Sequence, residues 1–186
     1  MPRGQRRKTV LNTVCPEALR IAGTLTDSIV DGPGIRYVIF TQGCPHHCPG
    51  CHNPQTHDPK GGRDADVEEI LQQIAANPLS AGVTFSGGEP FLQAEALIPV
   101  ARRVKALGKN LTIYTGDLYE QLTKSEKPGV RELLSLADLL VDGPFLLAER
   151  DLTLPYRGSS NQRVIDLAKT RETGTVVLYK SEYEDL

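Results

Sequence analysis

The sequence lacks any hydrophobic run close to the ~20 residues that a helix needs to cross a bilayer. Its N-terminus also lacks the apolar core of a secretory signal, so we expect no export. Charge of one sign is not in excess, because 21 Lys and Arg stand against 23 Asp and Glu, for a net charge of -2. A protein that covers nucleic acid with its whole surface needs a basic excess, so that class is excluded.

What is present is the composition of an ordinary globular protein, with 39% hydrophobic and 24% charged residues. This excludes a disordered tail, a collagen-like fibre and a small disulfide scaffold. The length of 186 residues fits one domain, which we expect over residues 18–186. Residues 1–17 are expected to form a flexible, solvated extension, with a local contact to an anion as the alternative. The basic residues of this extension are Arg3, Arg6, Arg7 and Lys8.

Strand-like and helix-like patterns alternate along the chain. The expected strands are 18–25, 35–41, 82–86, 111–115 and 138–141, with weaker candidates at 164–165 and 176–178. The expected helices run from about 64 to 77, and over 91–107, 118–122 and 130–136. Strand–helix–strand repetition implies parallel strands with right-handed crossovers, and about four such units are too few for a full barrel. The sequence therefore predicts the α/β class, with an open, incomplete (β/α) barrel-like parallel sheet.

Four segments with chemistry-bearing or glycine residues each follow an expected strand. In parallel sheets of this kind, function lies at the C-terminal ends of the strands. We therefore expect the four segments to meet at one rim and to form a cofactor site there. They are the cysteine loop after residue 41, the Gly-Gly-Glu-Pro turn at 87–90, Thr115-Gly116-Asp117 and Val141-Asp142-Gly143.

The cysteines and histidines are strongly clustered. Cys44, Cys48 and Cys51 lie within eight residues, whereas Cys15 lies 29 positions before the first of them. All four histidines fall between positions 46 and 57. In a cytoplasmic protein, which we expect here, such a cluster binds a metal or acts in catalysis more often than it forms disulfides. The histidines are His46, His47, His52 and His57, and His46 and His47 have the alternative of being plain polar loop residues.

The spacing C-x3-C-x2-C favours an iron–sulfur cluster over zinc. Three thiolates from one tight loop can hold three corners of a four-iron cube, which leaves one iron open to a substrate or cofactor. Zinc with three cysteines and one histidine is the alternative, but structural zinc sites commonly draw their ligands in two separated pairs. Cys15 is a candidate fourth ligand, although we expect it to be a free thiol.

The turn Ser86-Gly87-Gly88-Glu89-Pro90 is the second candidate element. Two glycines let a ligand approach the backbone, and freed N–H groups can hold a carboxylate or ribose oxygen. Glycine pairs occur in many turns, and a lone glutamate is often a solvated surface acid. The expected position of Glu89 on the same rim as the cysteines favours a functional interpretation.

These motifs resemble the radical S-adenosylmethionine superfamily, through the cysteine loop and the Gly-Gly-Glu-Pro turn. The segments 30–36 (VDGPGIR), 42–44 (QGC) and 51–54 (CHNP) are similar to those of glycyl-radical-enzyme activases. Segments 141–145 (VDGPF) and 156–163 (YRGSSNQR) resemble one branch, the proteins that activate anaerobic ribonucleoside-triphosphate reductase. The matching motifs run from about position 24 to 166, which is most of the chain.

The resemblance implies an oxidoreductase in which Cys44, Cys48 and Cys51 hold a 4Fe-4S cluster and the open iron binds S-adenosylmethionine. Reductive cleavage of that cofactor would give a 5′-deoxyadenosyl radical, which takes a hydrogen from a glycine of the reductase. Flavodoxin or ferredoxin is the implied electron donor. The alternatives are an activase of a formate-lyase-type partner, another short radical enzyme, and a zinc or electron-carrier module that is not an enzyme.

The resemblance also implies which residues contact the cofactor. The backbone of Gly87 and Gly88 is expected at its methionine end, and the backbone of Gly50 and His52 is expected near its adenine. The superfamily usually has a bulky residue before the third cysteine, and Gly50 stands there instead, which removes a ring that could stack on adenine. Four polar residues are expected to bind the cofactor carboxylate or dock the partner's glycine loop, with a loop-stabilising hydrogen-bond network as the alternative. They are Arg157, Asn161, Gln162 and Arg163. Asp31 and Arg36 are expected to shape the cofactor pocket or the face that meets the partner, with a turn stabilised by a salt bridge as the alternative. The expected cofactor-binding residues are Gly50, Cys51, His52, Ser86, Gly87, Gly88, Glu89, Arg157 and Asn161.

Overall fold

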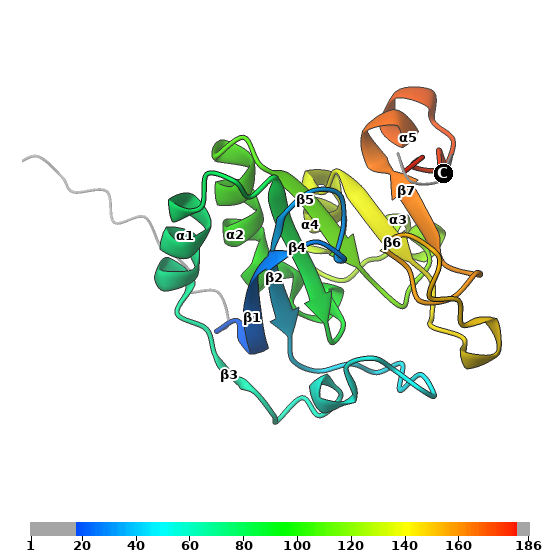
Figure 1. The fold of residues 1–186 in the computed structure, drawn as a ribbon, viewed down its shortest axis with the longest axis horizontal. Helices are drawn as coiled ribbons and strands as arrows, with labels where there is room; N and C mark the ends of the chain where they lie inside the picture. Colours follow the sequence, from blue (N-terminus) through cyan, green and yellow to red (C-terminus); the bar gives the residue numbers. More distant parts are fainter. Residues whose placement is uncertain (1–17, 182–186) are drawn as a thin grey trace, which may run out of the picture.

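A computed structural model describes residues 18–181, so the expectations for the basic extension and for Cys15 lie outside the described residues. The described chain forms one seven-stranded sheet in the order β3-β1-β2-β4-β5-β6-β7 (Figure 1). Its strands are β1 (Arg20–Ser28), β2 (Arg36–Thr41), β3 (Arg63–Asp64), β4 (Gly82–Gly87), β5 (Asn110–Tyr114), β6 (Leu139–Asp142) and β7 (Arg163–Asp166).

The four central strands β2, β4, β5 and β6 are parallel, which confirms the predicted open α/β sheet. Helices cross between them: α1 (Val67–Ala76) before β4, α2 (Ala94–Ala106) before β5, and α3 (Tyr119–Thr123) and α4 (Val130–Leu136) before β6. The outer strands run antiparallel to their neighbours. β1 does so because the turn at 29–35 leads directly back into β2 and leaves no room for a crossover helix.

The hydrophobic core lies between one face of the sheet and the helices, which gather on the same side of it (Figure 1). Alternate residues of each strand point to this face, so Ile39, Phe85 and Ile113 pack there and are fully buried. They meet Leu97 and Leu133 from α2 and α4. This packing holds the crossover helices against the sheet. It therefore also fixes the C-terminal ends of the strands, which form the rim that carries the loops.

The opposite face of the sheet is more polar, and its largest buried side chain is Arg36. The Arg36 guanidinium donates hydrogen bonds to the side chains of Thr84, Thr112 and Asn110, at 3.0, 2.8 and 3.0 Å, and to the carbonyl of Val83 at 2.6 Å. All of these acceptors are neutral, so burial lowers the pKa of Arg36 to about 10. Arg36 thus joins three parallel strands at their N-terminal ends, far from the cysteine loop.

Several element boundaries differ from the prediction. The helix expected from about residue 64 begins at Val67, because Asp66 caps it by accepting a hydrogen bond from the Glu69 amide, and Arg63–Asp64 pair with β1 instead. The helix expected from residue 91 begins as a 3₁₀ turn, η2 (Pro90–Gln93), before α2. Residues 176–178 form only a single bridge to β7, and helix α5 (Leu167–Thr173) was not predicted. The remaining 3₁₀ turns are η1 (Pro54–Thr56) and η3 (Leu147–Glu149).

Candidate active site

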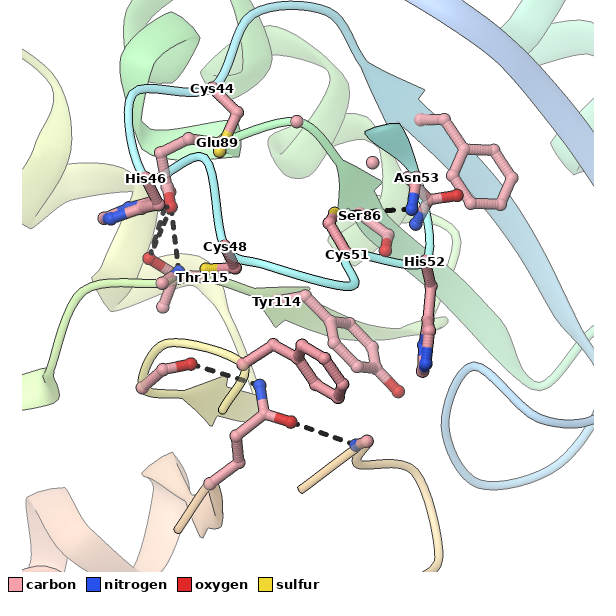
Figure 2. Close-up of a pocket in the computed structure, with 18 of the residues that line it drawn as sticks. Cys44, His46, Cys48, Cys51, His52, Asn53, Ser86, Glu89, Tyr114 and Thr115 are labelled. Atoms are coloured by element: carbon pink, nitrogen blue, oxygen red, sulfur yellow. Dashed lines mark hydrogen bonds and ion pairs between the residues drawn. The ribbon is translucent and has the colours of Figure 1, made fainter. Parts of the chain in front are cut away.

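The four segments after β2, β4, β5 and β6 meet at one pocket of about 350 Å³ (Figure 2). This confirms the predicted rim, because each segment leaves the C-terminal end of a parallel strand. The volume falls within the ~300–1,000 Å³ typical of small-molecule sites. Its lining includes Cys44, Cys48 and Cys51, the turn Ser86–Gly88, and the aromatic side chains of Phe40, Tyr114 and Phe145.

The cysteine loop is held at its base by backbone hydrogen bonds. The Gly43 amide donates to the Thr56 carbonyl at 2.7 Å, and the Cys44 amide donates to the His57 carbonyl at 3.2 Å. Within the loop, the Cys51 amide donates to the Cys48 carbonyl at 3.1 Å, and Gly50 between them has a φ of 74°. A residue without a side chain adopts that left-handed conformation without strain.

All three thiols are free and half-buried, and Figure 2 shows their sulfur atoms around a common space. Burial raises the pKa of the Cys44 thiol, and the nearby Glu89 carboxylate raises it further. A bound iron would reverse this effect, because a coordinated thiol loses its proton. The donor set is therefore three soft sulfurs from one loop on one pocket wall, which fits three corners of an iron–sulfur cube.

The glycine turn after β4 is packed directly on the start of the cysteine loop. The Gly88 amide donates to the Thr41 carbonyl at 2.9 Å, and the Glu89 amide donates to the Gly43 carbonyl at 2.8 Å. A Cβ at Gly88 would lie 2.4 Å from the Gly43 carbonyl oxygen, so no other residue fits there without moving one of the two loops. The sequence rule that glycine marks a close backbone approach holds at this position.

The Glu89 side chain is buried, with 2% exposure, and accepts hydrogen bonds from three loops. Its carboxylate accepts from the Thr115 hydroxyl at 3.0 Å, the Gly116 amide at 2.9 Å and the Phe91 amide at 3.1 Å. His46 Nε2 lies 3.1 Å from Glu89 Oε2, and this contact raises the pKa of His46. Glu89 is thus a clamp between the cysteine loop and the loop after β5, and not the solvated acid that was the alternative.

His46 also bears on the zinc alternative. Its Nε2 points to the carboxylates of Glu89 and Asp117, at 3.1 and 3.8 Å. Within residues 18–181, these three side chains form the one group of at least three His, Cys, Asp or Glu residues whose ligand atoms all lie within 4.8 Å of one another, and no cysteine belongs to it. With Nε2 engaged in this way, a tetrahedral site of three thiolates and His46 would have to use Nδ1.

The predicted cofactor-binding residues separate into two groups in the structure. Those that line the pocket are Cys51, His52, Ser86, Gly87, Gly88 and Glu89. Gly50, Arg157 and Asn161 lie outside its lining. Arg157 lines a neighbouring groove and donates to the Gln162 carbonyl at 3.0 Å, and the Asn161 amide donates to the Pro144 carbonyl at 2.8 Å. These contacts are those of a loop-stabilising hydrogen-bond network.

Sequence reasoning missed the aromatic walls, Phe40, Tyr114 and Phe145. Each stands at or just after the C-terminal end of a parallel strand, so the positional rule that found the glycine turn could have found them. Tyr114 donates to the Tyr156 carbonyl at 2.6 Å, and burial raises the pKa of its phenol. Figure 2 shows its ring turned toward the pocket beside Cys51 and His52.

Comparison with known proteins agrees with this site. A family model described as a 4Fe-4S single cluster domain matches residues 30–165. The chain is 33% identical over 144 residues to the anaerobic ribonucleoside-triphosphate reductase-activating protein of Haemophilus influenzae, covering 72% of this chain and 89% of that protein. It is 32% identical to the protein of the same name from Escherichia coli, covering 73% and 91%.

Two further likenesses are less complete. The chain is 36% identical over 146 residues to pyruvate formate-lyase 1-activating enzyme of Escherichia coli, covering 75% of this chain but 57% of that enzyme. The crystal structure of QueE from Escherichia coli aligns over 53% of each chain, with a TM-score of 0.44 and 20% identity, which is too partial to bear on function.

The chain belongs to the radical S-adenosylmethionine enzymes that activate glycyl-radical proteins, a family built on a 4Fe-4S single cluster domain. Its cofactors are a 4Fe-4S cluster and S-adenosylmethionine. Within residues 18–181, no helix combines the length and apolar character that a membrane crossing requires.

Proposed function

We propose that this protein generates a glycyl radical on an anaerobic ribonucleoside-triphosphate reductase. The observation that carries the proposal is the presence of three free thiols and a glycine turn on the walls of one pocket. Relatives named as activators of that reductase, which this chain covers to about nine tenths of their length, support the choice of partner.

In this proposal, Cys44, Cys48 and Cys51 hold three irons of the cluster, and the fourth iron is left for S-adenosylmethionine. When bound, the reduced cluster would supply one electron to S-adenosylmethionine, so that S-adenosylmethionine and a glycine of the partner would yield methionine, 5′-deoxyadenosine and a glycyl radical. Gly87 and Gly88 present backbone to the methionine end, since neither has a side chain and a Cβ at either would lie under 3 Å from Phe40 or Gly43. The protein itself binds, orients and keeps out water and oxygen.

A second groove supports a protein substrate. It holds about 540 Å³ and shares Asp31, His52, Tyr114 and Gly158 with the cofactor pocket, so the two are continuous. Its outer wall carries exposed apolar side chains, with Ile29, Val30 and Leu152 exposed by 72%, 69% and 70%. Exposed apolar groups next to a catalytic pocket are typical of a surface that another protein covers. We place the partner's glycine loop in this groove.

A flavodoxin or ferredoxin as electron donor and a cytoplasmic location belong to the same proposal. Three free thiols that must stay reduced to bind iron favour a reducing compartment. The donor is tested by mixing the oxidised cluster with each reduced carrier under anaerobic conditions. Electron paramagnetic resonance should show a reduced cluster with at least one of them, and no transfer from either would contradict the donor assignment.

The function is tested by radical transfer. The reconstituted protein, S-adenosylmethionine and a reductant are mixed without oxygen with the reductase encoded in the same genome. We expect the doublet of a glycyl radical on the reductase, one 5′-deoxyadenosine for each radical formed, and neither product with Cys48→Ala. Cleavage of S-adenosylmethionine without a radical on the reductase would contradict the proposed partner.

A formate-lyase-type partner is the second candidate, on the strength of the 36% identity to a pyruvate formate-lyase-activating enzyme. The chain spans only 57% of that enzyme. The same experiment with a formate lyase in place of the reductase separates the two. A radical on the lyase alone would select this second candidate.

A further inference from the structure

Phe145 is a pocket residue that the proposed function leaves without a role. It follows β6, and its ring lines the cofactor pocket beside Tyr114 and His52. We propose that the adenine of S-adenosylmethionine packs against the Phe145 ring, and that Ser159, Asn161 and Gln162 are positioning residues that hold this ring in place. The inference rests on the identity of the cofactor and not on that of the partner protein.

Two glycines lie beside the ring. A Cβ at Gly158 would come within 3.1 and 3.2 Å of Phe145 Cδ2 and Cε2, so a larger residue there would push the ring by a few tenths of an ångström. A Cβ at Gly50 would lie 3.5 Å from Phe145 Cε1 and only 2.9 Å from Leu147 Cδ1. The place of a bulky residue before the third cysteine is therefore already filled by side chains of the loop after β6.

A third neighbour limits the tilt of the ring. The ring centres of Phe145 and His52 are 5.0 Å apart, with an angle of 49° between their planes. His52 follows the third cysteine directly, so the ring is packed against the part of the cysteine loop where the adenine end of the cofactor is expected. The Phe145 ring thus joins the cysteine loop to the loop after β6.

The backbone on both sides of Phe145 is fixed by residues 159–162. The Asn161 amide donates to the Pro144 carbonyl at 2.8 Å, and the Leu146 amide donates to the Ser159 hydroxyl at 3.2 Å. Gln162 donates to the Gly143 carbonyl at 3.1 Å and accepts from the Gly158 amide at 3.0 Å. Gln162 therefore links Gly158, which lies against the Phe145 ring, to Gly143 at the end of β6, two residues before Phe145.

The chemistry of the pocket favours adenine as the group on this ring. The thiols and the glycine turn form one side, which suits the amino and carboxylate groups of the methionine end. The remaining lining includes the rings of Phe40, Tyr114 and Phe145 beside polar groups such as Asp31 and Gln162, and a flat purine gains most by packing on such rings. Base–aromatic stacking is worth enough that its removal weakens binding by roughly tenfold to a hundredfold.

The test compares two ligands on the cluster-loaded protein. Phe145→Ala should weaken binding of S-adenosylmethionine by roughly tenfold or more, measured by anaerobic equilibrium dialysis, and leave binding of methionine alone unchanged. Phe145→Tyr should keep affinity because it keeps a ring, and Leu79→Ala, at a position that is 74% exposed and outside the pocket lining, should bind both ligands like the unmodified protein. Unchanged S-adenosylmethionine affinity in Phe145→Ala, or an equal loss for both ligands, would overturn the proposal.

A second readout does not depend on activity. The chain contains no tryptophan, so Phe145→Trp introduces a single fluorophore at the proposed contact. S-adenosylmethionine should quench it saturably, whereas the same addition to Leu79→Trp, at an exposed position outside the pocket lining, should cause no saturable change. A flat titration with Phe145→Trp in protein shown by dialysis to bind the cofactor would contradict adenine contact.

The positioning role has its own test. Asn161→Ala should weaken S-adenosylmethionine binding less than Phe145→Ala does, and combining the two should add little, because both act through the same ring. Fully additive losses would overturn that role. Since no reductase takes part in these measurements, they stand or fall independently of the partner assignment.

Discussion

His46 Nε2 lies 3.1 Å from Glu89 Oε2, so a residue between two of the cysteines is tied to the carboxylate at the end of the glycine turn. Glu89 accepts further hydrogen bonds from Thr115 and Gly116 after β5. The loops after three neighbouring parallel strands therefore share one buried acceptor. This gives Glu89 the role of fixing the cysteine loop before any iron is bound.

Glu89→Gln tests this clamp. The amide replaces one acceptor oxygen with a donor, so a buried N–H of Phe91 or Gly116 loses its partner, at a cost of roughly 1–3 kcal/mol. We expect a lower urea midpoint for the metal-free protein and less iron bound after reconstitution. Glu126→Gln, at an exposed position, should change neither. An unaltered urea midpoint in Glu89→Gln would show that the clamp does not stabilise the loop.

Cys48→Ala tests the ligand set. Removal of one of three thiolates should abolish the cluster, seen as loss of bound iron and sulfide and of the brown absorption. Cys15→Ala, and a chain lacking residues 1–17, should keep all three signals, because we propose that residues 18–186 form one domain that holds the cluster alone. Loss of the cluster in Cys15→Ala would mean that a fourth cysteine closes the open iron.

Gly88→Ala tests the packing of the two loops. The added Cβ would lie 2.4 Å from the Gly43 carbonyl oxygen, a backbone atom that cannot rotate away. Overpacking of this kind costs roughly 1–3 kcal/mol. Gly23→Ala is the matched control, since a Cβ there would meet no atom within 4 Å. Denaturation of both proteins should show a loss for Gly88→Ala alone, and equal stabilities would disprove the close approach.

Arg36→Lys tests the buried cation at the far end of the sheet. Lysine has three donors against five and cannot reach Thr84, Thr112 and Asn110 together. We expect a loss of about 2 kcal/mol or more in the free energy of unfolding, because buried acceptors lose their donor. Arg102→Lys, in an exposed ion pair with Glu132, should cost under about 1 kcal/mol. Equal effects of the two would contradict the burial argument.

The fold was largely predictable because its centre follows local pattern. The strand at 36–41 has β-branched or aromatic residues at every position after Arg36, and helix 130–136 appears with the predicted bounds. The antiparallel course of β1 was readable from Asp31-Gly32-Pro33-Gly34, a turn too short for a crossover. Helix α5 was missed because residues 167–173 (LAKTRET) bury only two side chains and show little periodicity.

The site was predictable only where residues close in sequence carry the chemistry. The three cysteines and the glycine turn satisfy that condition. The placement of Asn161 on the Pro144 carbonyl, and not on the pocket lining, depends on how the loop after β6 returns along β7, which no local pattern specifies. The burial of Glu89 likewise depends on two loops that approach it from distant parts of the chain.

The central claim is that an iron without a protein ligand binds S-adenosylmethionine in this pocket. The direct measurement is electron–nuclear double resonance on the reduced, reconstituted protein, with S-adenosylmethionine carrying ¹⁵N in its amino group and ¹⁷O in its carboxylate. We predict hyperfine coupling of both labels to the cluster. A cluster that forms but shows no coupling to either label would contradict the account.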